Sequence, residues 1–349
     1  MRWLRIAFLP VSMVTLVSAA LIVPLPRYVE RPGQVLSLDD CVTVGEDNQT
    51  VPGDFLLTTV NVRPATLADL ARAAVQSDIQ IARNLVPRGM DTGSFFRQQR
   101  QNFVNSADVA AAVGLQAAGL PVELSGGEGA RILRVLPEGP AGELLRPGDV
   151  IMSVDSQRVR TDVELRRAIK ARGREGQPLA LAVIRSGRRL SIEVTPEILE
   201  GRLIIGVLPE TVNPIVSLPV GVEVRSGSVG GSSAGLMIAL TVFDKASDDV
   251  DLAAGRVIAG TGTIDLAGHV GPIGGVDLKI LAAQREGAEV FLTPRVDAPA
   301  AKAALPDDSP LQIVVVDTFD QARQALVNTA PETPGEAERA GTCPYGAPA

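Results

Sequence analysis

The ten residues from Ala234 to Phe243 (AGLMIALTVF) constrain the fold of this chain more than any other segment, because they are apolar on every side. Their pattern predicts a helix, and a helix without a polar face must be buried. A loop rich in Gly and Ser (SGSVGGSS) leads into this helix and ends at Ser233. The chain therefore needs a core that encloses a helix, and 349 residues with 46% hydrophobic content supply one.

The position of Ser233 indicates a nucleophile. Its hydroxyl is expected where a loop enters a buried helix, beside unpaired backbone N–H groups and the positive end of the helix dipole. Such a position presents a nucleophile and also stabilises an oxyanion. The alternative is a helix cap formed by Ser232 or Ser233, which is the commonest role of serine at a helix start.

A second candidate is Lys279, in the segment VDLKILAAQREGAE that follows two glycines. The segment predicts a helix closed by Gly287. At about 100° per residue, Lys279 lies among small apolar side chains and away from the polar stripe marked by Asp277 and Gln284. Burial lowers the pKa of a lysine, and a value of about 7 to 8 makes its amine a general base. The alternative is a lysine whose stem covers apolar surface while its ammonium reaches water.

The N-terminal residues predict a single-pass membrane anchor. Arg2 and Arg5 precede an uncharged apolar run from Ile6 to Leu25, which is about long enough to span a bilayer. Basic residues ahead of such a run favour a cytoplasmic N-terminus, so the bulk of the chain is expected outside the cytoplasm. The alternative is a signal peptide cleaved near the small residues Ser18 and Ala19.

Charge and cysteine content indicate which ligands and cross-links the chain is expected to have. A net charge of −7 and an aromatic content of 3% are unlike a nucleic-acid binder, which needs basic surface and stacking rings. Cys41 and Cys343 are the two cysteines of the sequence, and neither has a spacing typical of a metal site. Outside the cytoplasm they are able to form one disulfide, and two unpaired thiols are the alternative. No metal and no cofactor is expected.

The segment from 119 to 199 resembles a bacterial PDZ domain. The resemblance rests on LPEGPA at 136–141, LRPGDVI at 145–151 and a closing hairpin around RSG at 185–187. PDZ domains bind a peptide C-terminus by strand addition and hold its carboxylate with backbone N–H groups. By position, the carboxylate loop is Gly119, Leu120 and Val122, although the intervening Pro121 has no N–H to donate. A spacer or gate is the alternative role.

The segment from 200 to 327 resembles the proteolytic domain of the Lon family. The resemblance rests on Ser-Ala-Gly at 233–235, TGTIDLAG at 261–268, PIGG at 272–275 and KILAA at 279–283. It implies an α/β (α+β) domain in which Ser233 attacks the scissile carbonyl, Lys279 is the base and Thr261 holds the lysine. The oxyanion and nucleophile loop would be Gly231, Ser232 and Ala234. Lon itself has an Asp-Gly-Pro before the serine, whereas this chain has Gly-Gly-Ser.

The whole chain is similar to the bacterial PDZ-containing, membrane-anchored Lon-like proteases. The expected parts are an anchor or signal peptide (1–27), a region able to supply strands to the peptidase core (28–118), the PDZ domain (119–199), the proteolytic domain (200–327) and a flexible tail (328–349). Apolar spacing predicts a strand at 53–62 and helices at 67–85 and 107–115. The resemblance implies a homo-oligomer, as a hexameric ring.

The expected function is ATP-independent serine endopeptidase activity at the outer face of the cytoplasmic membrane. The sequence contains no GxxxxGK[ST] loop, so unfolded or flexible proteins are the expected substrates. One alternative is a non-catalytic PDZ scaffold with a Lon-like assembly domain. Another is an esterase of the α/β-hydrolase type, because residues 231–235 satisfy GxSxG and Asp265 and His269 follow in the right order.

Overall fold

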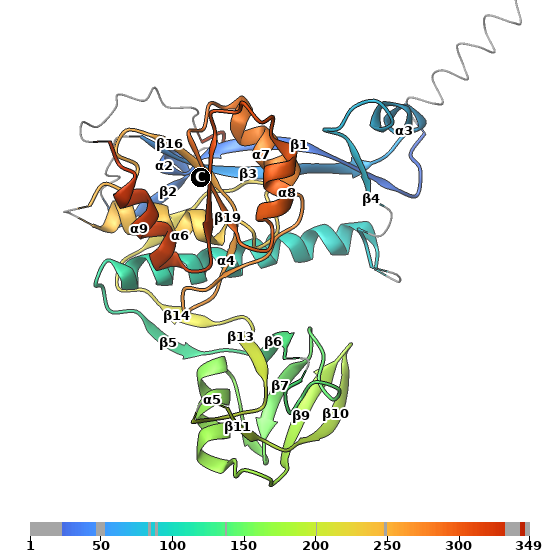
Figure 1. Cartoon of the computed structure of the whole chain (residues 1–349), viewed down its shortest axis with the longest axis vertical. Helices are drawn as coiled ribbons and strands as arrows, with labels where there is room; N and C mark the ends of the chain where they lie inside the picture. Colours follow the sequence, from blue (N-terminus) through green and yellow to red (C-terminus); the bar gives the residue numbers. More distant parts are fainter. Residues whose placement is uncertain are drawn as a thin grey trace, which may run out of the picture.

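The chain forms two domains, a large α/β domain and a smaller β-rich domain below it in Figure 1. The fold class predicted for the two domains is confirmed. No helix within the described residues is long and apolar enough to cross a membrane. The predicted anchor lies almost entirely outside those residues, as does most of the predicted tail. The computed structural model describes residues 23–46, 53–82, 85–87, 90–136, 138–199, 201–247, 250–331 and 343–345.

A six-stranded sheet forms the centre of the large domain, and its strands come from both sides of the small domain in sequence. The order is β20-β19-β16-β3-β1-β4, in which β3, β16, β19 and β20 are parallel and β1 is antiparallel to both neighbours. The small domain is therefore an insertion into the large one. The strands are β1 (Tyr28–Ser37), β3 (Asp54–Pro64), β4 (Gln80–Ala82), β16 (Val257–Gly260), β19 (Val290–Pro294) and β20 (Gln312–Val316).

Helices cover both faces of this sheet. On β3, Phe55 and Leu57 pack against α4, α6 and α9, whereas Leu56 packs toward α7 and α8. This alternation follows from the two-residue period of a strand. Burying each large aliphatic side chain contributes about 1.5–3 kcal/mol, so both helical layers are held firmly. The helices are α4 (Thr92–Ala117), α6 (Gly235–Ala246), α7 (Val276–Arg285), α8 (Ala298–Ala304) and α9 (Phe319–Asn328).

The apolar helix predicted from the sequence is α6, and it is buried throughout its centre. Leu236, Met237 and Leu240 have no exposed surface. Helix α4 packs along it most closely at Gly114, where a Cβ would lie 2.6 Å from the carbonyl oxygen of Ala239. A side chain at position 114 would push the two helices apart. Helix α4 also extends well beyond the predicted range 107–115, because the polar residues before it continue the helix along the surface.

The small domain is a sheet with one covering helix. Its strand order is β10-β9-β7-β6-β13, with β8 paired to β7. Ile132, Leu165 and Leu181 are completely buried in its core. Strand β13 follows residue 199, so the fold of this domain continues past the predicted boundary. The elements are β6 (Ala130–Val135), β7 (Val150–Val154), β8 (Gln157–Arg158), α5 (Asp162–Arg172), β9 (Leu179–Arg185), β10 (Arg188–Val194) and β13 (Val207–Thr211).

A two-stranded ribbon joins the domains, formed by β5 (Glu123–Gly126) and β14 (Ile215–Ser217) (Figure 1). The PDZ carboxylate loop predicted just before it does not lie on the PDZ sheet. Gly119 has a φ of +83° and follows α4, and the N–H of Leu120 donates to the carbonyl of Leu115 at 3.0 Å. This is a glycine C-cap of a helix. Leu120 and Val122 then pack against the core of the large domain, which corrects the prediction.

The remaining elements are short. The predicted helix at 67–85 ends at Ala73, and the chain after it pairs with β1 as β4. A disulfide joins Cys41, at the end of α2, to Cys343. The short elements are α2 (Leu38–Cys41), β2 (Val42–Val44) with β15 (Val222–Val224), α3 (Leu67–Ala73), β11 (Glu197–Leu199) with β12 (Arg202–Ile204), and β17 (Thr263–Ile264) with β18 (Val270–Gly271).

Candidate active site

The loop that carries Ser233 runs from β15 to α6 and is held by α4. Gly231 has a φ of +89°, a conformation that favours glycine, and its N–H donates to the carbonyl of Gln99 at 2.8 Å. The hydroxyl of Ser106 donates to the carbonyl of Ser232 at 3.2 Å. These two contacts with one helix fix the loop just before the serine.

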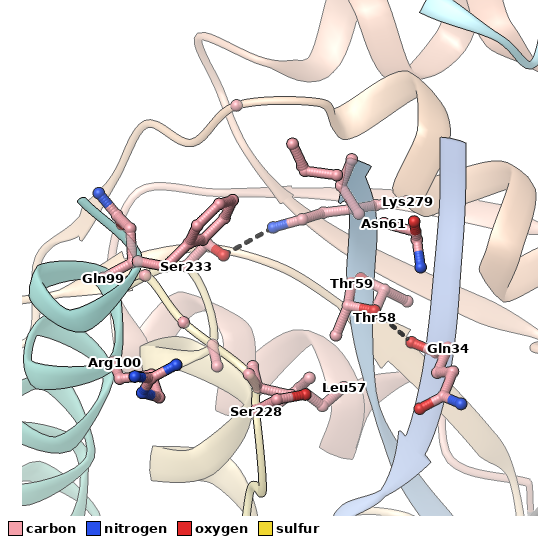
Figure 2. Close-up of a pocket in the computed structure, with 18 of the residues that line it drawn as sticks. Gln34, Leu57, Thr58, Thr59, Asn61, Gln99, Arg100, Ser228, Ser233 and Lys279 are labelled. Atoms are coloured by element: carbon pink, nitrogen blue, oxygen red, sulfur yellow. Dashed lines mark hydrogen bonds between the residues drawn. The ribbon is translucent and has the colours of Figure 1, made fainter. Parts of the chain in front are cut away.

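Three residues predicted from separate motifs meet at this loop. The Nζ of Lys279, on α7, lies 2.7 Å from the Oγ of Ser233 and 2.9 Å from the Oγ1 of Thr261 (Figure 2 draws the first contact). Thr261 donates its own hydroxyl proton to the carbonyl of Ser233 at 3.0 Å. Its oxygen therefore presents a lone pair to the amine. This arrangement leaves the lysine aimed at the serine oxygen.

The ε-amine of Lys279 is shielded from water, since the residue is only 4% exposed. Burial lowers the pKa of Lys279 to about 8, against the opposing effect of the Asp297 carboxylate. A neutral amine has two N–H groups and one lone pair. One N–H donates to Thr261, so the lone pair is free to take the proton of Ser233.

The carboxylate of Asp297 is a part of the site that the sequence did not reveal. It accepts a hydrogen bond from the N–H of Ile273 at 3.0 Å, in the PIGG segment that opens α7. Burial raises the pKa of Asp297, and the nearby Lys279 opposes that effect. Asp297 lies at the start of another helix, α8. No motif or spacing connects it to Lys279, so only the fold brings them together.

Donors for an oxyanion lie at the start of α6. Ala234 is its N-cap residue, and no side chain caps the helix, so neither Ser232 nor Ser233 has the alternative capping role. Within the described part of the chain, the N–H groups of Ser233 and Ala234 make no hydrogen bond. They are free to donate to a developing oxyanion. The N–H of Gly231 is not, because it is bonded to Gln99.

A cavity of about 450 Å³ opens beside the serine (Figure 2). Phe95 and Phe96 of α4 line one side, and Val60 and Val62 of β3 line the other. Both Ser233 and Lys279 face this cavity, so a bound chain would reach the reactive oxygen.

The described residues do not form the Ser-His-Asp triad that the esterase alternative requires. The Nδ1 of His269 lies 2.9 Å from the Oδ2 of Asp265, but His269 makes no hydrogen bond with Ser233 among the described residues. The serine oxygen bonds to Lys279 instead. In the same part of the chain, no cluster of three or more His, Cys, Asp or Glu residues is placed to hold a metal ion.

Comparison with known families matches this division of the chain. Residues 216–328 match the Lon protease (S16) C-terminal proteolytic domain, and residues 100–195 match the PDZ domain. The chain is therefore a PDZ-containing protein with a Lon-like proteolytic domain. The PDZ match begins inside α4, which packs on the large domain, and it ends before β13.

Curated relatives match about a third of this chain. The Lon protease of Roseiflexus castenholzii is 36% identical over 123 residues, which are 34% of this chain and 15% of that protein. The Lon protease of Rickettsia felis is 34% identical over 112 residues, which are 31% of this chain and 14% of that protein. The match thus spans a small part of the length of these relatives.

Solved structures of PDZ domains match about a quarter of this chain. The PDZ domain of an SdrC-like protein from Listeria innocua is 22% identical, with a TM-score of 0.22, over 23% of this chain and 92% of that one. The corresponding domain from Listeria monocytogenes is 18% identical, with a TM-score of 0.22, over 24% of this chain and 87% of that one.

Proposed function

We propose that this chain is an ATP-independent serine endopeptidase that cuts unfolded or flexible segments of proteins. The observation that carries the proposal is the buried Nζ of Lys279 at 2.7 Å from the Oγ of Ser233. The match to the Lon proteolytic domain supports the same reaction. The sequence has no nucleotide-binding GxxxxGK[ST] loop, which favours substrates that need no unfolding.

The reaction begins when neutral Lys279 takes the proton of Ser233, whose oxygen attacks the scissile carbonyl. The N–H groups of Ser233 and Ala234 stabilise the oxyanion that forms. Protonated Lys279 then gives its proton to the departing amine, and the acyl group stays on the serine. Water, deprotonated by the same lysine, releases the acyl group and restores the site. Thr261 keeps the amine oriented throughout.

Cleavage of a permanently unfolded protein by the full-length chain tests this mechanism. Ser233→Ala and Lys279→Ala should each abolish cleavage. Ser217→Ala on β14 and Lys302→Ala on α8 are matched controls, because both side chains are exposed and neither lines a cavity beside the serine. The two controls should cleave like the wild type.

The outcomes separate the alternatives. Equal and negligible cleavage by the wild type and Ser233→Ala would favour the non-catalytic scaffold. An esterase triad would lose its activity in His269→Ala, whereas a Ser-Lys enzyme should keep most of it on a short peptide. Rapid degradation of tightly folded proteins without flexible tails would contradict the proposed substrate class.

We also propose that the chain works at the outer face of the cytoplasmic membrane, held by an N-terminal anchor. The apolar run after two arginines supports the anchor. The disulfide between Cys41 and Cys343 supports an oxidising compartment. Thiol labelling of the protein from intact cells checks this: no thiol should react before reduction, and an externally added protease should reach the folded domains.

The PDZ domain is proposed to recruit substrates or to gate the site. Its edge strand β13 packs beside α5, where an added peptide strand would lie. Pro209 within β13 has no N–H, so the strand offers fewer donors than usual. The Lon resemblance also supports a homo-oligomeric ring, which light scattering of the purified chain checks directly.

A further inference from the structure

A second cavity, of about 360 Å³, lies between the two domains. The small domain supplies one wall through β6 and β13, and the large domain supplies the other through α4 and the β17–β18 hairpin. Ser232, the residue before the proposed nucleophile, lines this cavity. The PDZ domain therefore borders the active-site loop directly.

Three cavities adjoin one another around the serine. A shallow third cavity, of about 420 Å³, lies over Ser233. It shares Gly231, Ser233 and Gly274 with the cavity beside Phe95, and it shares Ser232 and Thr263 with the inter-domain cavity. The shared lining residues place the three cavities side by side, and together they are called the cleft, with the inter-domain cavity as one of its ends.

The wall from the small domain is the face of β6 and β13 that points away from the PDZ core. Ile132 of β6 is fully buried on the inner face. Leu133 and Leu208, on the outer face, are 41% and 36% exposed. Both leucines line the inter-domain cavity and give it an apolar wall. This face is distinct from the edge of β13 that lies beside α5.

The charges on this face leave one cation available. Arg131 pairs with Glu210 directly across the two strands, at 3.1 Å. Arg134 lies opposite Leu208 and makes no ion pair with any described residue. Its exposed guanidinium is therefore free to bind a carboxylate.

Side-chain contacts hold this wall in place against the large domain. The amide of Asn105, on α4, donates to the Oδ1 of Asn213 at 2.6 Å. The amide of Asn213 donates in turn to Glu128 at 2.8 Å, just before β6. This chain of bonds links α4 to the small domain at this end of the cleft.

We propose that the outer face of β6 and β13 is a substrate-binding surface for residues on one side of the cut. It takes an extended peptide segment that turns one side toward these strands, since alternate side chains of an extended chain share a side. On that side an apolar side chain packs on Leu133 and Leu208, and an acidic side chain two residues away pairs with Arg134. This inference rests on the proposed peptidase function and adds the PDZ domain to the substrate cleft itself.

Fluorogenic peptides of two lengths test the proposal on the full-length chain. The short peptide carries the cut site alone, and the long ones add Leu-Ser-Glu-Ser before or after it, so that Leu and Glu share one side of the extended chain. For the wild type, one of the two extensions should raise kcat/KM. In Arg134→Glu this gain should fall by about fivefold, as for loss of an exposed ion pair combined with repulsion. With the extension Leu-Ser-Lys-Ser, the gain in kcat/KM should be larger for Arg134→Glu than for the wild type.

The control is Arg188→Glu, an equal charge reversal on β10 at the far edge of the same sheet. It should respond to the extensions like the wild type. Absence of a gain from either extension, or the same gain in Arg134→Glu as in the wild type, would overturn the proposal.

A binding measurement on inactive variants tests the proposed surface independently of the peptidase reaction. A labelled long peptide should bind Ser233→Ala more tightly than Ser233→Ala/Arg134→Glu, as measured by fluorescence anisotropy. If no protein cleaves but this difference remains, the peptidase function fails and the binding surface stands. If cleavage depends on Ser233 but the two affinities are equal, the peptidase stands and the surface fails.

Discussion

Replacing Lys279 by Met should abolish peptidase activity and yet stabilise the fold at pH 7. The lysine is buried, and its pKa is lowered from 10.5 to about 8 by that burial. Below pH 8 the amine is charged in both states. In the folded state the charge is buried, whereas in the unfolded chain it is hydrated, so burial of the charge lowers the free energy of unfolding. Met has a similar length and no charge, so it removes this cost.

The magnitude follows from the two pKa values. A difference from 10.5 to about 8 corresponds to about 3 kcal/mol of free energy of unfolding, fully expressed below pH 8. Loss of the hydrogen bond to Thr261 offsets about 1 kcal/mol. We expect a net gain of about 2 kcal/mol at pH 7. The gain should vanish as the pH rises from 8 toward 10.5, because the lysine is then neutral in both states.

Urea unfolding of both proteins at several pH values measures this difference. Lys302→Met, at an exposed position on α8, is the control and should change stability little at any pH. The reasoning is refuted if Lys279→Met is less stable than the wild type at pH 7. It is equally refuted if a stabilisation at pH 7 persists unchanged near pH 10.5.

The other predictions concern the same site and one remote carboxylate. The kcat/KM of the wild type should rise about tenfold between pH 7 and 9 as Lys279 loses its proton, and a flat profile would contradict its role as the base. Thr261→Val removes one hydrogen bond to the lysine and one to the Ser233 carbonyl, so kcat should fall by about tenfold to a hundredfold while Tm changes modestly. Burial raises the pKa of Asp244 to about 7, so the folded state loses stability as pH rises from 4 to 7. Asp244→Asn keeps an acceptor for the N–H of Leu252 and should stabilise the fold by up to about 4 kcal/mol at pH 8 and little at pH 3, as followed by thermal unfolding.

Local patterns in the sequence mark both Ser233 and Lys279, and the structure brings their side chains into contact. Ser233 precedes an all-apolar helix, and Lys279 lies among small residues on a helix that follows a glycine pair. No local pattern predicts the contact between these two side chains, because it depends on the fold. It was expected only from the motifs that the chain shares with the Lon proteolytic domain. Asp297 has no such local pattern. Neither do Gln99 and Ser106, which hold the nucleophile loop from a helix that precedes the small domain.

The errors in secondary structure have physical causes of the same kind. Helical spacing continues past Ala73, but β1 offers an open edge that the chain pairs with as β4. Gly119 followed by an apolar residue is typical both of a carboxylate loop and of a helix C-cap, and the long helix before it decides for the cap. Strand β13 carries no local sign that it belongs to the small domain, since its partner β6 is far earlier in the chain.

Because the small domain is inserted into the large one, the two domains cannot be separated by a single cut in the chain. A fragment that begins at residue 200 would lack β1, β3 and β4, half of the central sheet, and would expose the strand β16 that they protect. The ribbon gives a better place to divide the chain, because Glu123 and Ser217 already stand opposite each other across its two strands. A short glycine bridge between these positions would remove the whole inserted module and leave the sheet paired. The same junction accepts a foreign recognition domain whose ends lie equally close together.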